Sequence, residues 1–457
     1  MSDDRLTRLK TGAFERRFSI ARASLVAGSR MAASAAGSLF AAPENRASSR
    51  RKALGEQAEY LVGELGKLKG SVVKIGQMMA LYGEHVLPPE ITAALHELND
   101  STTALHWSSL EPLVRAQLGQ RYNDLDINPE PLGAASLAQV HRARRRSDGA
   151  ELVLKIQYPG VADAIDSDLN LVTQMLRLTR AVPQTREFDE WLDEVRMMMH
   201  REVNYPLEAE TTRLFREFLK NDLRFVVPKI YPEYCGQNLL VMSYEQGVPV
   251  NSDAVLSLSA ARKNALALAA LEICCQEVFQ WGQIQTDPNF GNYLVQISAD
   301  PQHELDRIVL LDFGAVRDFP ADILDLARGM TRAAFYADRD AMKAAMKGYR
   351  FFDGMKLGTL EGFIDLAFLA FEPFAESHKV PRELINADGA YCWAKSKLHV
   401  RATAAAARSA ATRHFSVPPK EFMFLSRKLM GAYTFMTVME AEVKARDLLA
   451  KYLQSAS

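Results

Sequence analysis

Residues 285–295 read QTDPNFGNYLV, and residues 308–314 read IVLLDFG. The end of the first stretch and the start of the second are short apolar runs, and a polar segment separates them. Two such runs joined by a polar turn predict a β-hairpin. The hairpin would hold Asn292 and Asp312 at its open end, with Asp287 five positions before Asn292. The pattern therefore predicts a site built from an acid, an amide and a second acid.

This order of residues is typical of an ATP-dependent phosphotransferase site. In such sites the first Asp orients the attacking nucleophile, and the Asn and the second Asp hold the magnesium of ATP. Carboxylate and amide oxygens are ligands that Mg²⁺ prefers. We therefore expect Asp287 to be catalytic, and Asn292 and Asp312 to bind the metal. A simple turn is the alternative, because Pro, Asn and Gly all favour turns.

The composition excludes several other classes of protein. The chain has 457 residues, of which 48% are hydrophobic and 24% charged, as in an ordinary globular protein. A net charge of −1 gives no general attraction to nucleic acid, so no such partner is expected. The four cysteines form no metal-binding or disulfide spacing, which suits a reducing cytosol.

The sequence also argues against a membrane-spanning or secreted protein. The most apolar C-terminal stretch, residues 422–438, is interrupted by Arg427 and Lys428. The N-terminal residues have no apolar core of the signal-peptide type. We expect a cytoplasmic chain, with any membrane attachment peripheral.

Residues 1–52 form a basic N-terminal extension. Phe14, Phe18 and Leu25 fall on one helical stripe with arginines around it. A helix of this kind can lie on an anionic membrane surface. Docking of the helix on the protein itself, or a flexible tail, would explain the same pattern.

Residues 53–125 predict a helical extension with an unusual face. Gly63, Gly66 and Gly70 share this face with Lys74 and Gln77. A glycine inside a helix costs about 1 kcal/mol, so we expect another backbone or a ligand to approach closely here. Lys74 and Gln77 are one turn apart and can reach one target together. A solvent-exposed polar face is the alternative.

Residues 126–247 predict a β-rich lobe with inserted helices. Lys155 lies in the apolar strand at 151–157, on the same face as Val153. A lysine in such a strand is rarely buried without a partner, and Glu202 or Glu208 on the following helices could supply one. The sequence does not choose between these two acids. In a kinase a lysine at this place binds the phosphates of ATP.

Two further parts of this lobe are candidate ATP contacts. The turn with Ala134, Ala135 and Ser136 lies where a kinase has its glycine-rich phosphate loop, and alanine makes a stiffer loop. The strand at 238–245, with Met242 and Tyr244, ends where a kinase binds adenine. Residues 248–457 follow as a helical lobe that carries the catalytic and metal-binding motifs.

With these motifs and KIGQ at residues 74–77, the chain resembles the UbiB/AarF/ADCK family of atypical kinases over roughly residues 60–320. The resemblance implies an α+β, protein-kinase-like fold of two lobes, with extra N-terminal helices over the active site. Lys74 and Gln77 would then cover that site. Glu208 matches the lysine-pairing acid of the family, and Glu202 begins a Glu-x-Asp motif whose Asp is replaced by Asn204.

The resemblance also implies a function. It implies binding of ATP and Mg²⁺, with ATPase or small-molecule kinase activity rather than protein phosphorylation. It implies support of ubiquinone (coenzyme Q) or related isoprenoid-lipid metabolism at a membrane. The expected partners are a lipid or prenylated small molecule, an anionic membrane surface and biosynthetic enzymes. A catalytically weak nucleotide-binding scaffold and a small-molecule phosphotransferase are the alternatives.

Overall fold

The structure, a computed structural model, describes residues 70–83, 87–98, 104–178, 182, 185–300, 305–353, 355–410 and 419–455, with a few positions between 55 and 66. The chain divides into two compact units. The first unit is Met1–Glu210 with Lys229–Tyr244, and the second is Thr211–Pro228 with Glu245–Ser457. The predicted amphipathic stripe of residues 1–52 lies outside the described residues.

The first unit contains a four-stranded antiparallel sheet. Its order is β1-β2-β3-β5, made of β1 (Leu125–Ala134), β2 (Ala138–Arg145), β3 (Glu151–Gln157) and β5 (Leu239–Ser243). In β3 the side chains of Leu152, Leu154 and Ile156 are fully buried, while Lys155 lies on the other face. This alternation is the one expected for a strand with one face in the core.

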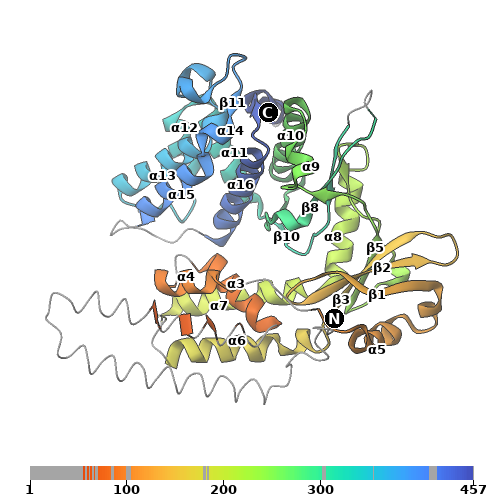
Figure 1. The fold of residues 1–457 in the computed structure, drawn as a ribbon. Coiled ribbons are helices and arrows are strands. Elements are labelled where there is room, and N and C mark those ends of the chain that lie inside the picture. The colour runs from red at the N-terminus through yellow and green to blue at the C-terminus, as the bar shows by residue number, and fades with distance from the viewer. Residues whose placement is uncertain are drawn as a thin grey trace. The chain divides into compact units, whose positions relative to one another are not determined.

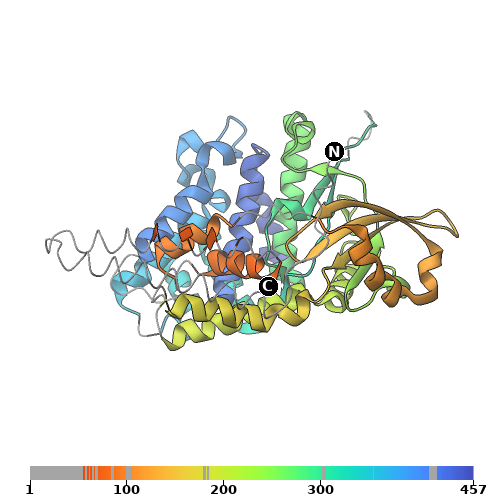
Figure 2. The ribbon, with the colours of Figure 1, turned by 60° about the horizontal axis from the view of Figure 1, so that its bottom comes forward.

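Outside the sheet, the described part of the first unit is mainly helical. The helices are α3 (Ser71–Tyr82), α4 (Pro89–His96), α5 (Trp107–Leu118), α6 (Val161–Leu178) and α7 (Arg186–Glu202). A further helix, α8 (Tyr205–Phe218), contains the boundary between the two sets of residues. The helix α3 packs against α4, α6 and α7 (Figures 1 and 2). Val72, Ile75 and Met79 of α3, spaced three and four positions apart, are fully buried and form the apolar face of this helix.

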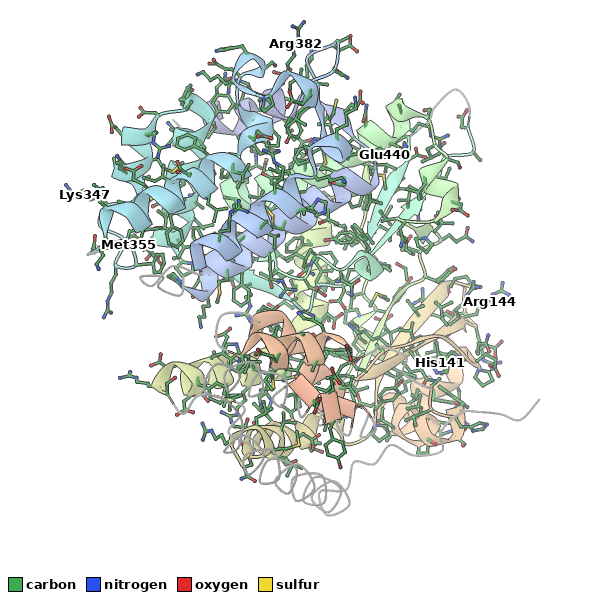
Figure 3. The ribbon with its side chains drawn as sticks, turned by 60° about the vertical axis from the view of Figure 1, so that its left-hand side comes forward. His141, Arg144, Lys347, Met355, Arg382 and Glu440 are labelled. Atoms are coloured by element: carbon green, nitrogen blue, oxygen red, sulfur yellow. The ribbon has the colours of Figure 1, made fainter. Side chains whose placement is uncertain are left out.

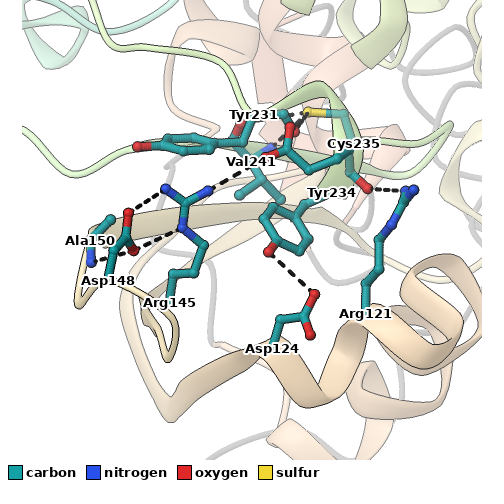
Figure 4. Close-up of polar contacts among 10 residues, drawn as sticks. Arg121, Asp124, Arg145, Asp148, Ala150, Tyr231, Tyr234, Cys235 and Val241 are labelled. Atoms are coloured by element: carbon teal, nitrogen blue, oxygen red, sulfur yellow. Dashed lines mark hydrogen bonds and ion pairs between the residues drawn. The ribbon is translucent and has the colours of Figure 1, made fainter.

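A cluster of polar side chains surrounds Arg145, the last residue of β2 (Figure 4). The guanidinium of Arg145 pairs with Asp148 at 2.6 Å and lies 4.9 Å from the ring centre of Tyr231. Its hydrogen bond holds the pKa of Asp148 down at about 2. Arg121 donates to the backbone oxygen of Glu233 at 2.6 Å. These contacts join the β2–β3 turn to the segment that precedes β5.

His141 in β2 is fully buried in this unit (Figure 3). Its Nδ1 bonds the backbone oxygen of Asn128 at 2.8 Å, and its Nε2 lies 2.9 Å from Nε2 of Gln139. Because the Gln139 amide is oriented by both backbone groups of Leu105, it presents a donor to the ring. Only the neutral imidazole with its proton on Nδ1 satisfies both neighbours. Burial lowers the pKa of His141, which agrees with this geometry.

The second unit is mainly helical around a second sheet of order β4-β9-β8-β6. Its strands are β4 (Phe225–Val226), β6 (Val248–Pro249), β8 (Tyr293–Gln296) and β9 (Arg307–Leu310). The antiparallel pairing of β8 and β9 places Tyr293 opposite Leu310. The predicted hairpin is therefore confirmed. Two short strand pairs also lie in the described part of this unit, namely β7 (Gln283–Gln285) with β10 (Val316–Asp318) and β11 (Tyr391–Cys392) with β12 (Glu442–Val443).

The helices of the second unit surround these strands. They are α9 (Asp253–Leu256), α10 (Ala260–Gln276), a π-helical turn (Glu277–Trp281), α11 (Ala321–Tyr336), α12 (Arg339–Met346), α13 (Leu357–Ala370), α14 (Trp393–Ser396), α15 (Leu398–Ala410), α16 (Lys420–Val438) and α17 (Ala445–Ser455). The buried Phe313 belongs to the core that they form. The mixed α+β class predicted from the sequence is confirmed. In the part of the chain that the structure describes, no helix is long and apolar enough to cross a membrane.

The buried, neutral His141 predicts a pH-dependent stability. Its folded-state pKa lies below the unfolded value of about 6.5, so the unfolded chain takes up a proton that the folded chain does not. The free energy of unfolding should therefore fall as the pH falls through about 6.5. In urea unfolding between about pH 7.5 and 5.5, His141→Gln should be less stable at the upper pH but lose less stability on acidification than the wild type. His378→Gln, at a side chain that is 73% exposed, is the matched control. Equal losses for wild type and His141→Gln would contradict this role.

Candidate functional site

Lys155 lies on β3, and its ammonium meets Glu208 on α8. The distance between Lys155 Nζ and Glu208 Oε1 is 2.7 Å, and the two side chains are 22% and 2% exposed. The ring centre of Tyr205 lies 5.3 Å from the same ammonium. The sequence left the partner of Lys155 open between two acids, and the structure selects Glu208.

Glu202 pairs instead with Lys74 on α3. Their charged atoms are 2.6 Å apart, and both side chains are less than one-third exposed. Directly after α7, Asn204 Oδ1 accepts a hydrogen bond from the backbone N–H of Leu207 at 3.1 Å. This bond caps the first turn of α8. The asparagine that replaces the family's Asp therefore helps to start the helix that carries Glu208.

The glycine-bearing face of residues 63–77 differs from the prediction. Gly70 does not lie inside a helix: it precedes α3 with a φ of 64°, a conformation that favours glycine. A Cβ at Gly63 would have no described neighbour within 4 Å, and at Gly66 it would make only an ordinary contact. The close approach occurs at Gly76, where a Cβ would lie 2.3 Å from Leu98.

Gln77 also contacts Leu98, which lies just after the end of α4. Its Nε2 donates to the backbone oxygen of Leu98 at 3.3 Å. One target for both Lys74 and Gln77 was expected, but the contacts just described lead to different elements, α7 and the end of α4. Their coverage of the active site remains a prediction.

The candidate phosphate loop is a tight turn between β1 and β2. Ala134 is the last residue of β1, and the N–H of Ala135 donates to the backbone oxygen of Ala138 at 2.8 Å. The side chain of Ser136 is buried. One of the backbone donors is thus bound within the turn itself, which agrees with the stiff loop expected from its alanines.

The candidate adenine contacts lie on β3 and at the end of β5. Val153 pairs with Met242 in the sheet, and Met242 is buried. The guanidinium of Arg142 lies 4.1 Å from the ring centre of Tyr244. The N–H of Tyr244 donates to the backbone oxygen of Glu151 at 3.0 Å. Any adenine contact from Tyr244 would therefore use its carbonyl or its side chain.

The acid–amide–acid set of the second unit is held by a network at the open end of the hairpin. The Nδ2 of Asn292 donates to Asp287 Oδ2 at 3.0 Å. The backbone N–H of Leu311 donates to the backbone oxygen of Asn292 at 2.9 Å, which fixes Asp312 beside it. Gln285 bonds both acidic residues, with its Oε1 accepting from the Asp287 N–H and its Nε2 donating to the Asp312 backbone oxygen. Asp287, Asn292 and Asp312 are therefore brought together as predicted from their spacing.

The donor chemistry at Asn292 and Asp312 fits a magnesium ion that also binds phosphate. Because Asn292 uses its nitrogen for Asp287, its amide oxygen is the end that can act as a metal ligand. A carboxylate and an amide oxygen leave coordination positions for water and phosphate oxygens. Among the described residues no group of three or more His, Cys, Asp or Glu side chains forms a metal-binding cluster.

The helix α16 also reaches this network, which the sequence did not reveal. Arg427 Nη2 lies 3.9 Å from Asp287 Oδ1, and Lys428 forms a buried pair with Glu277 at 2.7 Å. From the sequence, Arg427 and Lys428 served only to argue against a membrane-spanning helix. The feature of the sequence that could have indicated this role is the pair of adjacent charged residues inside an otherwise apolar helical stretch.

Comparisons with known proteins indicate a family for this chain. The sequence pattern of the ABC1 atypical kinase-like domain matches residues 97–346. The protein named atypical kinase COQ8B, mitochondrial, of Danio rerio is 27% identical over 395 residues, which cover 86% of this chain and 60% of that protein. Atypical kinase COQ8, mitochondrial, of Saccharomyces cerevisiae is 29% identical over 319 residues, or 69% of this chain and 62% of that protein. The chain thus spans about three-fifths of the length of these relatives.

A solved structure shares the fold. It is that of Rv3197 from Mycobacterium tuberculosis in complex with erythromycin, with a TM-score of 0.54 and 20% sequence identity. The similarity covers 84% of this chain and 92% of that one. At this identity the likeness concerns the fold alone.

The pairing of Lys155 with Glu208 predicts a specific energetic coupling. Lys155→Met should destabilise the protein by about 3 kcal/mol, because it leaves a buried carboxylate without its partner. A double-mutant cycle of Lys155→Met with Glu208→Gln, measured by urea unfolding, should give a coupling of roughly 0.5–3 kcal/mol. The matched cycle with Glu202→Gln should be additive. Additivity in both cycles would contradict the pairing.

Proposed function

Because the chain belongs to the family of ABC1 atypical kinase-like proteins, we propose that it is an ATP-dependent atypical kinase or ATPase that uses Mg²⁺. The observation that carries this proposal is the network of Asp287, Asn292 and Asp312 at the open end of the β8–β9 hairpin. A second group of residues in the first unit, Lys155 with Glu208, has the chemistry to bind phosphates. Both groups match the order in which a kinase uses them.

Each residue has a distinct part in this proposal. Asn292 and Asp312 would hold Mg²⁺, which supplies charge neutralisation for the phosphates. Lys155 would bind the phosphates, with Glu208 holding its ammonium in place. Asp287 would orient the attacking hydroxyl or water, and its bond to Asn292 keeps its carboxylate beside the metal ligands. The phosphoryl acceptor is a small molecule or water in this proposal, not a polypeptide.

The biological setting is the second part of the proposal. We place the chain in ubiquinone or related isoprenoid-lipid metabolism at a membrane. The similarity to the COQ8 atypical kinases supports this setting. A lipid or prenylated small molecule, an anionic membrane surface and biosynthetic enzymes are the partners proposed.

Contacts within the first unit support a role for α3 in nucleotide turnover. Lys74 holds Glu202 at the end of α7, and Asn204 then caps the helix that presents Glu208 to Lys155. A change at Lys74 can therefore reach the phosphate-binding lysine through the junction of α7 and α8.

The metal role of Asp312 is tested by nucleotide-dependent stabilisation. ATP with Mg²⁺, at about a hundred times its Kd, should raise the free energy of unfolding of the wild type by about 2.7 kcal/mol. Asp312→Asn should keep the fold, because the Asn oxygen can still accept the bond from the Gly314 N–H, but should lose the magnesium-dependent stabilisation. Asp325→Asn, at a carboxylate that is 74% exposed, is the matched control. Undiminished stabilisation of Asp312→Asn would rule out the metal role.

The role of Lys74 is tested by ATP turnover. Lys74→Ala should change the rate of phosphate release or the preference among nucleotides, because it frees Glu202 and loosens the start of α8. Its effect on stability should be at most about 1 kcal/mol, as for other partly exposed pairs. Lys343→Ala, at another partly exposed lysine–glutamate pair, is the control. Wild-type affinity and hydrolysis in both Lys74→Ala and Gln77→Ala would show that this helix does not act on the site.

A further inference from the structure

One glycine of α16 lets this helix touch the loop of Asp287 directly. A Cβ at Gly431 would lie 2.0 Å from Cβ and 3.0 Å from Cγ of Pro288. Neither atom can move away easily, because both belong to a proline ring next to Asp287. The middle of a helix favours alanine over glycine, so the glycine here reflects the contact rather than the helix.

A buried ion pair joins the same helix to the other end of this segment. Lys428 Nζ lies 2.8 Å and 2.7 Å from the two carboxylate oxygens of Glu277, and the side chains are 8% and 1% exposed. Burial, the largest single effect, would lower the pKa of Lys428, but its polar and charged neighbours, Glu277 foremost, together raise it. Lys428 therefore stays protonated.

Glu277 stands at the start of the segment that leads to Asp287. It begins the π-helical turn, which ends at Gly282 with a φ of 68° and continues directly into β7. The backbone N–H of Gln285 points to Glu277 Oε1 at 3.5 Å. The ion pair thus fixes the start of this segment and, through Gln285, the last residue of β7, and Gly431 contacts the loop after that strand.

We propose that α16 is a positioning element for Asp287, with Lys428 and Gly431 fixing the two ends of the segment that carries this aspartate. Arg427, on the same turn of α16, adds its guanidinium 3.9 Å from the Asp287 carboxylate. The proposal rests on the proposed role of Asp287 in ATP turnover. Stability alone is a weak reason for the ion pair, because apolar residues of similar size often replace a buried pair without loss.

Because apolar residues can replace a buried ion pair without loss of stability, a positioning role of this pair can be distinguished from a purely structural one. The double variant Glu277→Met with Lys428→Met removes both charges and keeps the volume, so its melting temperature should stay near that of the wild type. Its kcat for ATP turnover should fall by about tenfold or more, because a shift of the order of 1 Å at a reacting group lowers rates strongly. The KM for ATP should change little, since Lys155, Asn292 and Asp312 are untouched.

A second variant tests the other contact without changing any charge. Gly431→Ala pushes on Pro288 and should also lower kcat with little change in KM. Gly358→Ala in α13, where a Cβ would have no neighbour within 4 Å, is the matched control and should keep the wild-type kcat. If the double variant does not fold, the comparison of Gly431→Ala with Gly358→Ala tests the positioning role of α16.

The outcomes distinguish this inference from the proposed function. Wild-type protein that neither releases phosphate nor gains magnesium-dependent stabilisation from ATP would overturn both. An active wild type whose double variant and Gly431→Ala both keep the wild-type kcat would overturn the positioning role of α16 and leave the proposed function intact. A loss of kcat in either variant, with KM and melting temperature near the wild-type values, would support the inference.

Discussion

The register of the β8–β9 hairpin is the constraint on which the candidate site depends. Tyr293 faces Leu310 across the two strands, so Asn292, just before β8, lies opposite Leu311, the residue next to Asp312. A slip of one residue would send alternate side chains to the opposite face. In the observed register Val295 faces Ile308 across the strands, and both side chains are buried in the core of this unit. The core of the second unit therefore sets the geometry of its acidic groups.

The sequence correctly predicted the features that depend on motifs and on local residue patterns. The kinase-like family assignment and the α+β class are confirmed, and the hairpin and the alternation in β3 are as predicted. These features follow from apolar residues that recur every two, three or four positions. Such spacing can be read from the sequence without knowing which elements pack together. The resemblance also identified Glu208 correctly as the residue that would pair with Lys155.

Contacts between distant parts of the chain could not be predicted in this way. The residue pattern by itself left Glu202 and Glu208 open, because their partners, Lys74 and Lys155, lie on other elements far along the chain. The glycine face was wrong because the pattern assumed one continuous helix, whereas Gly70 turns the chain before α3. Gly76 and Gly431 are among the described glycines that meet close neighbours, and the neighbours of these two, Leu98 and Pro288, lie outside their own helices. Helical periodicity predicts which residues share a face of a helix, but it does not predict which element packs against that face.

The buried pair of Glu277 and Lys428 has a consequence for how the chain can evolve. The two residues are 151 positions apart and almost fully buried. Losing one partner of such a pair typically costs about 3–5 kcal/mol, a large share of the roughly 5–15 kcal/mol that keeps a domain folded. Substitution at either position alone is therefore strongly disfavoured, and the two should covary among relatives. Chimeras that exchange the C-terminal helices between relatives would then fold well only when both positions come from the same parent.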